Sequence, residues 1–252
     1  MVTAELRETP LLEQSASTSV VDRTAIRQRA ARHLEDVLNL APNVNFAGGS
    51  SRARFYQVRG IGERSQFVEP LNPSVGLRID GVDFSGLGTA ALLFDVEQVE
   101  VLRGPQGTLF GRNTTAGLVN VFTNQPTEEH EGYLTGQFGS FKGRLIEGGV
   151  SGGITDNIRG RASFYYNEDE GFQTNLAIPD GVKWSKKDVF SARVQLSVDL
   201  TPDANLLLKA GYTEDRSVAP MTGTQGALDP DTLAPCSNDR IIANECVNGV
   251  GF

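Results

Sequence analysis

The second half of the chain alternates apolar and polar residues with a period of two. Residues 132–139 and 158–167 alternate in this way, and residues 144–154 and 205–214 follow the same pattern less strictly. The clearest run is 190–200, whose apolar positions are Phe190, Ala192, Val194, Leu196, Val198 and Leu200. Because successive side chains of a β-strand point to opposite faces, these runs predict five strands, each with one apolar and one polar face.

Short and long connections alternate between these predicted strands. Residues 155–157 and 201–204 are short turns, whereas about 20 residues separate the third strand from the fourth. Together with strand lengths near the ~9 to 11 residues of a tilted membrane strand, this favours an antiparallel transmembrane β-barrel. Residues 139–143 would be a short exception among the longer loops. A soluble or surface β-rich binding or adhesion module with no transport activity remains the alternative, and it requires protein to cover the apolar face of 190–200.

The first half of the chain predicts a small α+β domain. Residues 24–40 repeat apolar side chains at helical spacing, which predicts one amphipathic helix. His33 lies beside the apolar face of this helix, where a lone histidine is usually solvated or hydrogen-bonded rather than a metal ligand. The Asp80-Gly81 dipeptide predicts a two-residue hairpin turn. Short strands are expected at 43–46, 55–59, 74–84, 96–102 and 117–123.

A glycine-rich stretch between the last two of these strands is the most specific signal in the sequence. Residues 96–125 contain Gly104, Pro105, Gly107, Gly111 and Gly117, so the backbone must turn tightly more than once. A phosphate-binding loop is not indicated, because neither nucleotide-binding glycine motif is present and a strand rather than a helix follows Gly117. We therefore expect a structural role for this stretch.

Composition and charge exclude several functions. The 23 basic and 31 acidic residues give a net charge of −8, which argues against a nucleic-acid partner. The chain has two histidines, His33 and His130, and no nucleophile motif or carboxylate cluster, so we expect no enzyme, no bound metal and no cofactor. No window approaches 18 apolar residues, which excludes a membrane-spanning helix. Met1 is followed by polar residues rather than by a signal peptide, so we expect either a sequence that begins after the signal or a fragment.

Two cysteines, Cys236 and Cys246, have nine residues between them. This spacing fits a disulfide that closes a small loop in an oxidising compartment, and two unpaired thiols are the less favoured alternative. A metal site would need two more ligands, and none stands nearby.

Three phrases, in order, resemble the plug domain of TonB-dependent outer-membrane receptors: R-F-Y-Q-V-R-G-I-G, V-G-L-R-I-D-G-V and V-E-V-L-R-G-P-Q-G-T-L-F-G-R. The resemblance implies an α+β plug domain followed by antiparallel transmembrane β-barrel strands. It divides the chain into a flexible TonB-box-like segment (1–19), the plug domain (20–126) and about five barrel strands with their loops (127–252). Plugged barrels of this kind close with 22 strands, so the barrel would be incomplete and the chain an amino-terminal fragment.

The same resemblance implies roles for individual residues. Val2, Thr3 and Ala4 are similar to the TonB box, which adds as a strand to the periplasmic TonB protein. Arg59 and Arg103 occupy places similar to plug arginines that pair with barrel carboxylates. The plug core motif comprises Glu100, Gly104, Pro105, Gly107, Gly111, Asn113 and Gly117.

The function implied is uptake of a scarce nutrient through the Gram-negative outer membrane, energised by TonB, with the plug toward the periplasm. The ligand would be a ferric siderophore, cobalamin, haem or a carbohydrate, bound at the extracellular face. The expected partners are TonB, outer-membrane lipid and this small-molecule ligand.

Overall fold

The computed structural model describes residue 10 and residues 17–48, 52–65, 72–87, 91–173, 183–220 and 226–248. The chain divides into two compact units, Met1–Ala219 and Pro220–Phe252. None of the helices in the described ranges is long and apolar enough to cross a membrane.

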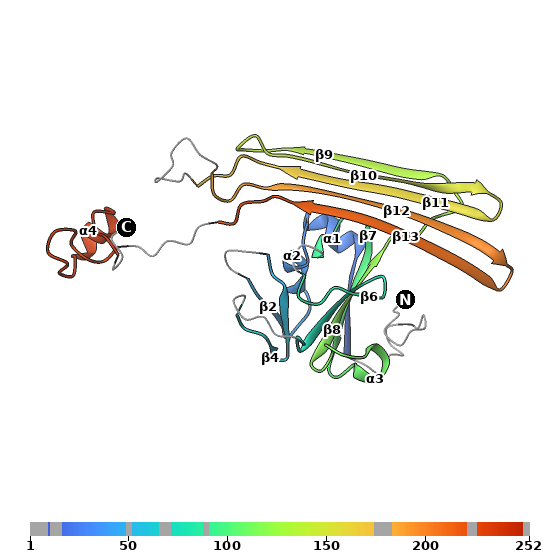
Figure 1. The fold of residues 1–252 in the computed structure, drawn as a ribbon, viewed down its shortest axis with the longest axis horizontal. Helices are drawn as coiled ribbons and strands as arrows, with labels where there is room; N and C mark the ends of the chain where they lie inside the picture. Colours follow the sequence, from blue (N-terminus) through green and yellow to red (C-terminus); the bar gives the residue numbers. More distant parts are fainter. Residues whose placement is uncertain are drawn as a thin grey trace. The chain divides into compact units, whose positions relative to one another are not determined.

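The amino-terminal part of the first unit contains two small sheets (Figure 1). The larger sheet has the order β1-β7-β8-β5-β6, in which only the β5–β8 pair is parallel. Its strands are β1 (Ser17–Asp22), β5 (Val75–Ile79), β6 (Val82–Asp83), β7 (Val96–Arg103) and β8 (Gly117–Thr123). The smaller sheet consists of β2 (Val44–Ala47), β3 (Phe55–Val58) and β4 (Ile61–Gly62). Side chains from both sheets form one buried apolar cluster with the first two helices.

The single helix predicted over 24–40 is wrong, because the structure has two short helices there. These are α1 (Arg23–Gln28) and α2 (Glu35–Leu38), and Ala30 between them has a left-handed φ of 49°. The backbone of residues 32–34 bonds to residues 91–93 instead of continuing the helix. His33 is fully buried at this crossing, and its Nδ1 accepts a hydrogen bond from the Glu35 amide at 3.4 Å. Two further short helices are α3 (Gly107–Phe110) and α4 (Asn238–Ile242).

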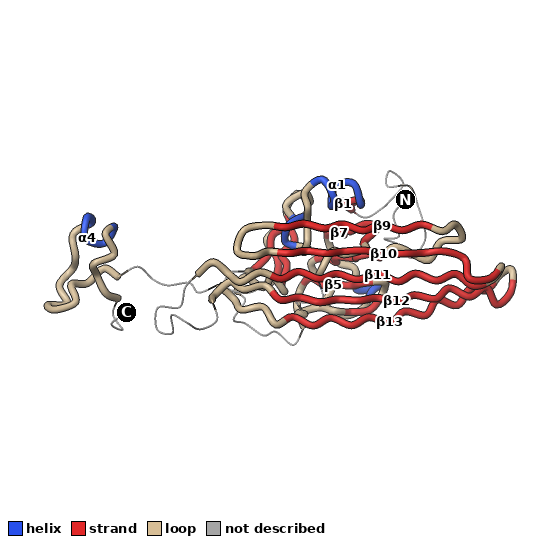
Figure 2. The backbone as a smooth tube through the Cα atoms, turned by 90° about the horizontal axis from the view of Figure 1, so that it is seen from above, coloured by secondary structure: helices blue, strands red, loops and turns tan. Residues whose placement is uncertain are grey.

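The second half of the first unit is one antiparallel sheet with the order β13-β12-β11-β10-β9. All five predicted strands are present, several of them longer than predicted. They are β9 (Glu131–Phe138), β10 (Arg144–Thr155), β11 (Ile158–Glu168), β12 (Asp188–Thr201) and β13 (Ala204–Asp215). The strands run side by side as a curved layer (Figures 1 and 2), and the sheet is not closed into a barrel by these five strands.

The polarity of this sheet is the reverse of that in a soluble β-sandwich. On β12 the polar Ser191 and Gln195 are each only 1% exposed, whereas Val194 between them is 58% exposed. On β11, Arg161 and Ser163 are buried and Phe164 is exposed. The soluble alternative requires the apolar face of 190–200 to be covered, and nothing in the described part of the chain covers it. The sheet therefore turns its polar face to the amino-terminal domain and its apolar face outward, as a membrane barrel does.

Candidate functional site

The contact between the amino-terminal domain and the five-stranded sheet is centred on the ion pair Asp95–Arg161. Asp95 immediately precedes β7, and Arg161 lies on the polar face of β11. The Arg161 guanidinium donates from Nε to Asp95 Oδ2 at 2.8 Å and from Nη2 to Asp95 Oδ1 at 2.5 Å. The Asp95 side chain is 0% exposed and the Arg161 side chain is 4% exposed. A bidentate pair of this kind fixes both the distance and the orientation of the two elements that carry it.

Neighbouring polar groups form further hydrogen bonds with both members of this pair. Asn124 Nδ2 donates to Asp95 Oδ1 at 2.7 Å, and Arg161 Nη1 donates to Glu131 Oε1 at 2.9 Å. Burial raises the pKa of Asp95, but the hydrogen bonds from Arg161 and Asn124, together with the charge of Arg161, outweigh burial and lower the pKa below its usual value. Asp95 is therefore charged at neutral pH, and its charge is compensated inside the contact.

A second polar contact lies at the end of β8. Gln195 on β12 donates from Nε2 to the backbone oxygen of Asn124 at 2.8 Å. Arg23 at the start of α1 donates to Asn124 Oδ1. Asn124 thus connects α1, the segment before β7 and strand β12 of the sheet, because its side-chain amide also donates to Asp95.

A third contact joins the β5–β6 turn to β13. The Asp80 carboxylate accepts hydrogen bonds from the Thr123 amide at 2.9 Å and from Thr123 Oγ1 at 2.7 Å, and it pairs with Lys209 Nζ at 3.1 Å. Asp80 has a left-handed φ of 49°, as the predicted hairpin turn requires, so the Asp80-Gly81 dipeptide both turns the chain and anchors it to the sheet.

An apolar cluster and a cavity lie next to the Asp95–Arg161 pair. Phe94 packs in a buried cluster with Leu145, Tyr165 and Val189 of the sheet. On the other side, a cavity of about 230 Å³ is lined by polar side chains that include Asp95, Arg161, Glu131, Tyr133, Glu147 and Arg23. The arrangement holds two layers together through charge and hydrogen bonding, and the described residues contain no group of three His, Cys, Asp or Glu side chains that could hold a metal ion.

Arg59 and Arg103, the two arginines predicted to pair with barrel carboxylates, make their described contacts within the amino-terminal domain. Arg103 donates from Nε to Ser17 Oγ at 3.1 Å and from Nη1 to Ser19 Oγ at 2.7 Å. Burial and the nearby charge of Arg59 lower the pKa of Arg103. Arg59 is exposed and has a left-handed φ of 53°. Among the described residues neither arginine forms an ion pair with the sheet, so their role in contacting a barrel wall stays a prediction.

Sequence reasoning missed the pair that does join the two layers. The prediction placed the cations on the plug and the carboxylates on the barrel. In the Asp95–Arg161 pair the carboxylate belongs to the plug and the cation to the sheet. One usable signal was present: Arg161 is a charged residue on the polar face of the predicted strand 158–167, where it needs a partner once that face is covered.

The glycine-rich motif forms a compact turn between β7 and β8. Gly104 N donates to Ala116 O at 3.0 Å and Gln106 N to Thr114 O at 2.9 Å, so the turn is closed by backbone bonds. Gly117 lies where the backbones approach closely, since a Cβ there would stand 2.6 Å from Leu102 O. The other motif positions lie around this turn. Glu100 is buried on β7, Gly107 is the first residue of α3, and Gly111 is the C-cap that follows its last residue. Pro105 follows Gly104, and Asn113 Nδ2 donates to Asp83 Oδ2 at 3.2 Å.

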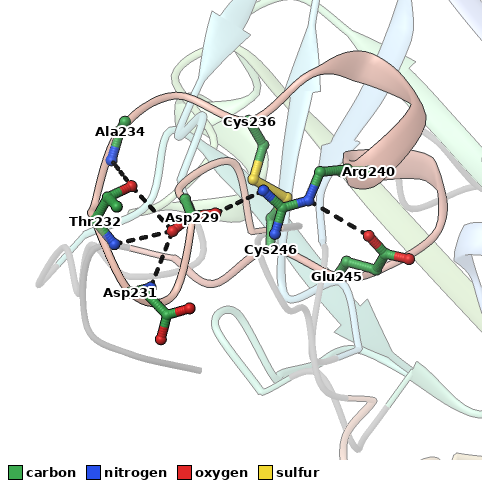
Figure 3. The surroundings of a disulfide bond; sticks show 8 residues. All are labelled: Asp229, Asp231, Thr232, Ala234, Cys236, Arg240, Glu245 and Cys246. Atoms are coloured by element: carbon green, nitrogen blue, oxygen red, sulfur yellow. Dashed lines mark hydrogen bonds and ion pairs between the residues drawn. A yellow bond between two sulfur atoms is a disulfide. The ribbon is translucent and has the colours of Figure 1, made fainter.

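The second unit is built around a disulfide (Figure 3). Cys236 and Cys246 are bonded, with an S–S distance of 2.07 Å. Asp229 accepts hydrogen bonds from Arg240 Nη1 at 2.6 Å and from the Asp231 and Thr232 amides at 3.0 and 2.9 Å. These bonds lower the pKa of Asp229, the largest effect being that of Arg240. In the described range 226–248, Leu233 and Ile242 are exposed, Leu228, Ile241 and Val247 are partly buried, and Cys246 is the buried hydrophobic residue. The disulfide and the Asp229 bonds therefore do much of the work of a hydrophobic core.

Removing the disulfide should therefore unfold the second unit alone. We expect the Cys236→Ser/Cys246→Ser double variant to destabilise this unit by roughly 3 kcal/mol, as the loss of a short disulfide loop does. Hydrogen exchange should rise sharply in residues 227–248 and stay unchanged in β9–β13. Unchanged exchange in residues 227–248 would show that the hydrogen bonds of Asp229 keep the second unit folded without the disulfide.

The lowered pKa of Asp95 predicts a pH dependence of the contact. A depressed carboxyl pKa contributes stability that is fully present above the unfolded value of about 3.9 and is lost as pH falls through the folded value. We expect hydrogen exchange of the segment around Asp95 to be constant from pH 7 to 5 after correction for intrinsic rates, and protection to fall below about pH 4. The Asp95→Asn variant should lack this acid transition, and an identical transition in that variant would assign the loss to other carboxylates.

A small α+β domain packed on the polar face of an antiparallel sheet whose apolar face points outward is the arrangement expected of a plugged membrane β-barrel. Residues 10–118 match the TonB-dependent receptor plug domain family. The pesticin receptor of Yersinia pestis is 28% identical over 191 residues, which are 75% of this chain and 28% of that protein. The vitamin B12 transporter BtuB of Vibrio vulnificus is 31% identical over 134 residues, which are 52% of this chain and 21% of that protein.

A solved structure extends the match into the sheet. The ferric yersiniabactin uptake receptor FyuA from Yersinia pestis superimposes with a TM-score of 0.68 at 26% identity, over 79% of this chain and 31% of that chain. The chain matches the TonB-dependent receptor plug domain over residues 10–118, and the antiparallel strands that follow match the solved receptor structure. It spans less than a third of the length of these relatives.

Proposed function

We propose that the protein carrying these residues takes up a scarce nutrient through the outer membrane, energised by TonB. The observation that supports this most strongly is the inverted polarity of β10–β12 together with the buried Asp95–Arg161 contact. An exposed apolar face is suited to contact with membrane lipid. A buried bidentate ion pair holds the plug firmly, yet it can separate when the plug moves.

The relatives indicate the kinds of nutrient. They are named as a receptor for pesticin, a vitamin B12 transporter and a ferric yersiniabactin uptake receptor. Ferric siderophores and cobalamin are therefore the first candidates for this protein, with haem and carbohydrate behind them. The plug residues named above select none of these ligands over the others.

TonB would act on the segment that contains Val2, Thr3 and Ala4, which lies outside the described residues. Strand addition uses the backbone hydrogen bonds of the added segment. Pulling on this segment would first load β1, which is an edge strand bonded only to β7 among the described strands. Arg103 bonds to Ser17 and Ser19 of β1, so it would resist the first step of this movement.

The test is uptake of a panel of ferric siderophores and cobalamin by a Gram-negative host without receptors of its own. We expect one compound to accumulate only when both this protein and TonB are present. Thr3→Pro should abolish accumulation and leave surface binding intact, because proline lacks the N–H that strand addition needs. Glu8→Pro is the control outside the box. Equal uptake without TonB would contradict the proposal.

A further inference from the structure

A second and larger cavity lies between the β5–β6 hairpin and strands β12 and β13. Its volume is about 420 Å³, within the range of small-molecule sites. The side formed by the plug is mainly apolar, with Val82, Phe84 and Leu87, and it also carries the Asp80 carboxylate. The side formed by the sheet carries Arg193 and Lys209. The cavity is separate from the Asp95–Arg161 contact, and neither the family match nor the relatives' names assign it a role.

The two cations of this cavity differ in how they are compensated. Lys209 pairs with Asp80 at 3.1 Å. Arg193 lies with its guanidinium carbon 4.5 Å from the centre of the Phe94 ring, and its Nη1 donates to Phe94 O at 3.4 Å. In the part of the chain that the structure describes, no carboxylate forms an ion pair with Arg193. Among the described residues, the one hydrogen bond from its five N–H donors is that to Phe94 O, which leaves donors for a ligand.

Gly211, the residue paired with Arg193 on the neighbouring strand, has no side chain and leaves open space beside Arg193. Arg193 on β12 is paired in register with Gly211 on β13. A Cβ at Gly211 would meet only Ala192 O within 4 Å, at a distance of 3.7 Å, so a side chain would fit where none is present. Gly211 alternates with Lys209 and Thr213 on the polar face of β13. Asp80 and Asp95 act on the Arg193 guanidinium only at a distance, without an ion pair among the described residues. An open volume beside such a guanidinium, lined largely by apolar side chains, suits an anion with an apolar body.

We propose that this cavity binds a small organic anion, with its carboxylate on Arg193 and its apolar body against Phe84 and Leu87. Phe94 holds the guanidinium plane on one side, and the absence of a side chain at Gly211 admits the ligand on the other. This binding needs neither TonB nor transport, so it is measured on the purified protein and its outcome is independent of the uptake proposal.

The test is ligand-observed ¹⁹F NMR with 4-fluorobenzoate and the protein in detergent micelles, with empty micelles as the baseline. We expect line broadening by the wild type and a much weaker effect with the neutral isostere 4-fluorobenzyl alcohol. Arg193→Met should weaken 4-fluorobenzoate binding at least tenfold, and Gly211→Leu should abolish it by filling the cavity. Arg216→Met, at an exposed arginine paired with Glu214, is the matched control and should bind like the wild type.

Circular dichroism and thermal unfolding establish that each variant is folded. Gly211→Leu changes no charge. If Arg193→Met does not fold, Gly211→Leu still tests the proposal. Absence of 4-fluorobenzoate binding by the wild type would overturn the proposal, as would undiminished binding by folded Gly211→Leu. Binding lost in Gly211→Leu but unchanged in Arg193→Met would overturn the assignment of the anion to Arg193.

Discussion

Replacing Arg161 with methionine should release the plug domain from the sheet. The substitution leaves the Asp95 carboxylate buried without its guanidinium partner, and breaking a buried ion pair from one side costs about 3–5 kcal/mol. We expect faster proteolysis of the segment around Asp95. In cells, we expect entry of a bulky antibiotic that the intact outer membrane excludes.

Arg159→Met is the matched control for this experiment. Arg159 lies two residues away on the same strand and pairs with Glu128 and Asp199, but its side chain is 21% exposed and its partners are 83% and 40% exposed. Exposed pairs contribute about 0–1 kcal/mol, so this variant should behave nearly like the wild type. Combining Asp95→Asn with Arg161→Met should recover part of the loss, because no charge is then left buried. Equal effects of Arg161→Met and Arg159→Met would contradict the role given to Asp95–Arg161.

Replacing Val194 with lysine should prevent stable insertion of the sheet into a membrane. Val194 is 58% exposed and lies near the middle of β12, on the apolar face. A lysine at the bilayer midplane of a barrel strand costs roughly 2–4 kcal/mol, whereas the same change on a water-exposed surface costs within about 0.5 kcal/mol. The expected result is a lower unfolding midpoint in lipid vesicles and less protein in the outer membrane.

Ile61→Lys provides the control for the lysine substitution. Ile61 is also 58% exposed, but it lies on β4 of the plug domain, away from the apolar face. We expect little change in stability from this variant. Similar stabilities of Val194→Lys and Ile61→Lys would mean that β12 faces water and would contradict a lipid-facing sheet.

The strands were predictable from the sequence because the pleat of a β-strand imposes a period of two on any strand with two different surroundings. Residues 190–200 show this fully, and β12 includes all of them. Periodicity does not say which face is covered, since a soluble sandwich has the same pattern. That question was answered by the buried Gln195 and the exposed Val194, which depend on where the plug domain lies.

Contacts between distant segments were beyond sequence reasoning. The helix predicted over 24–40 breaks because residues 32–34 bond to residues 91–93, and a local apolar pattern carries no information about that crossing. Asp95 and Arg161 are separated by 66 positions and meet only when the two layers pack. The resemblance to plug domains supplied the fold but directed attention to Arg59 and Arg103, whose contact with a barrel wall remains a prediction.

The orientation of β12 can be measured most directly with spin labels at single introduced cysteines. Labels at positions 190, 194 and 198 in lipid vesicles should relax strongly with oxygen and weakly with a water-soluble nickel complex, because lipid concentrates oxygen and excludes the complex. A label at position 61 in the plug domain should show the reverse, and Cys236 and Cys246 do not react while they are bonded to each other. Nickel accessibility at 194 as high as at 61 would contradict the account that this sheet faces the membrane with its apolar side and the plug with its polar side.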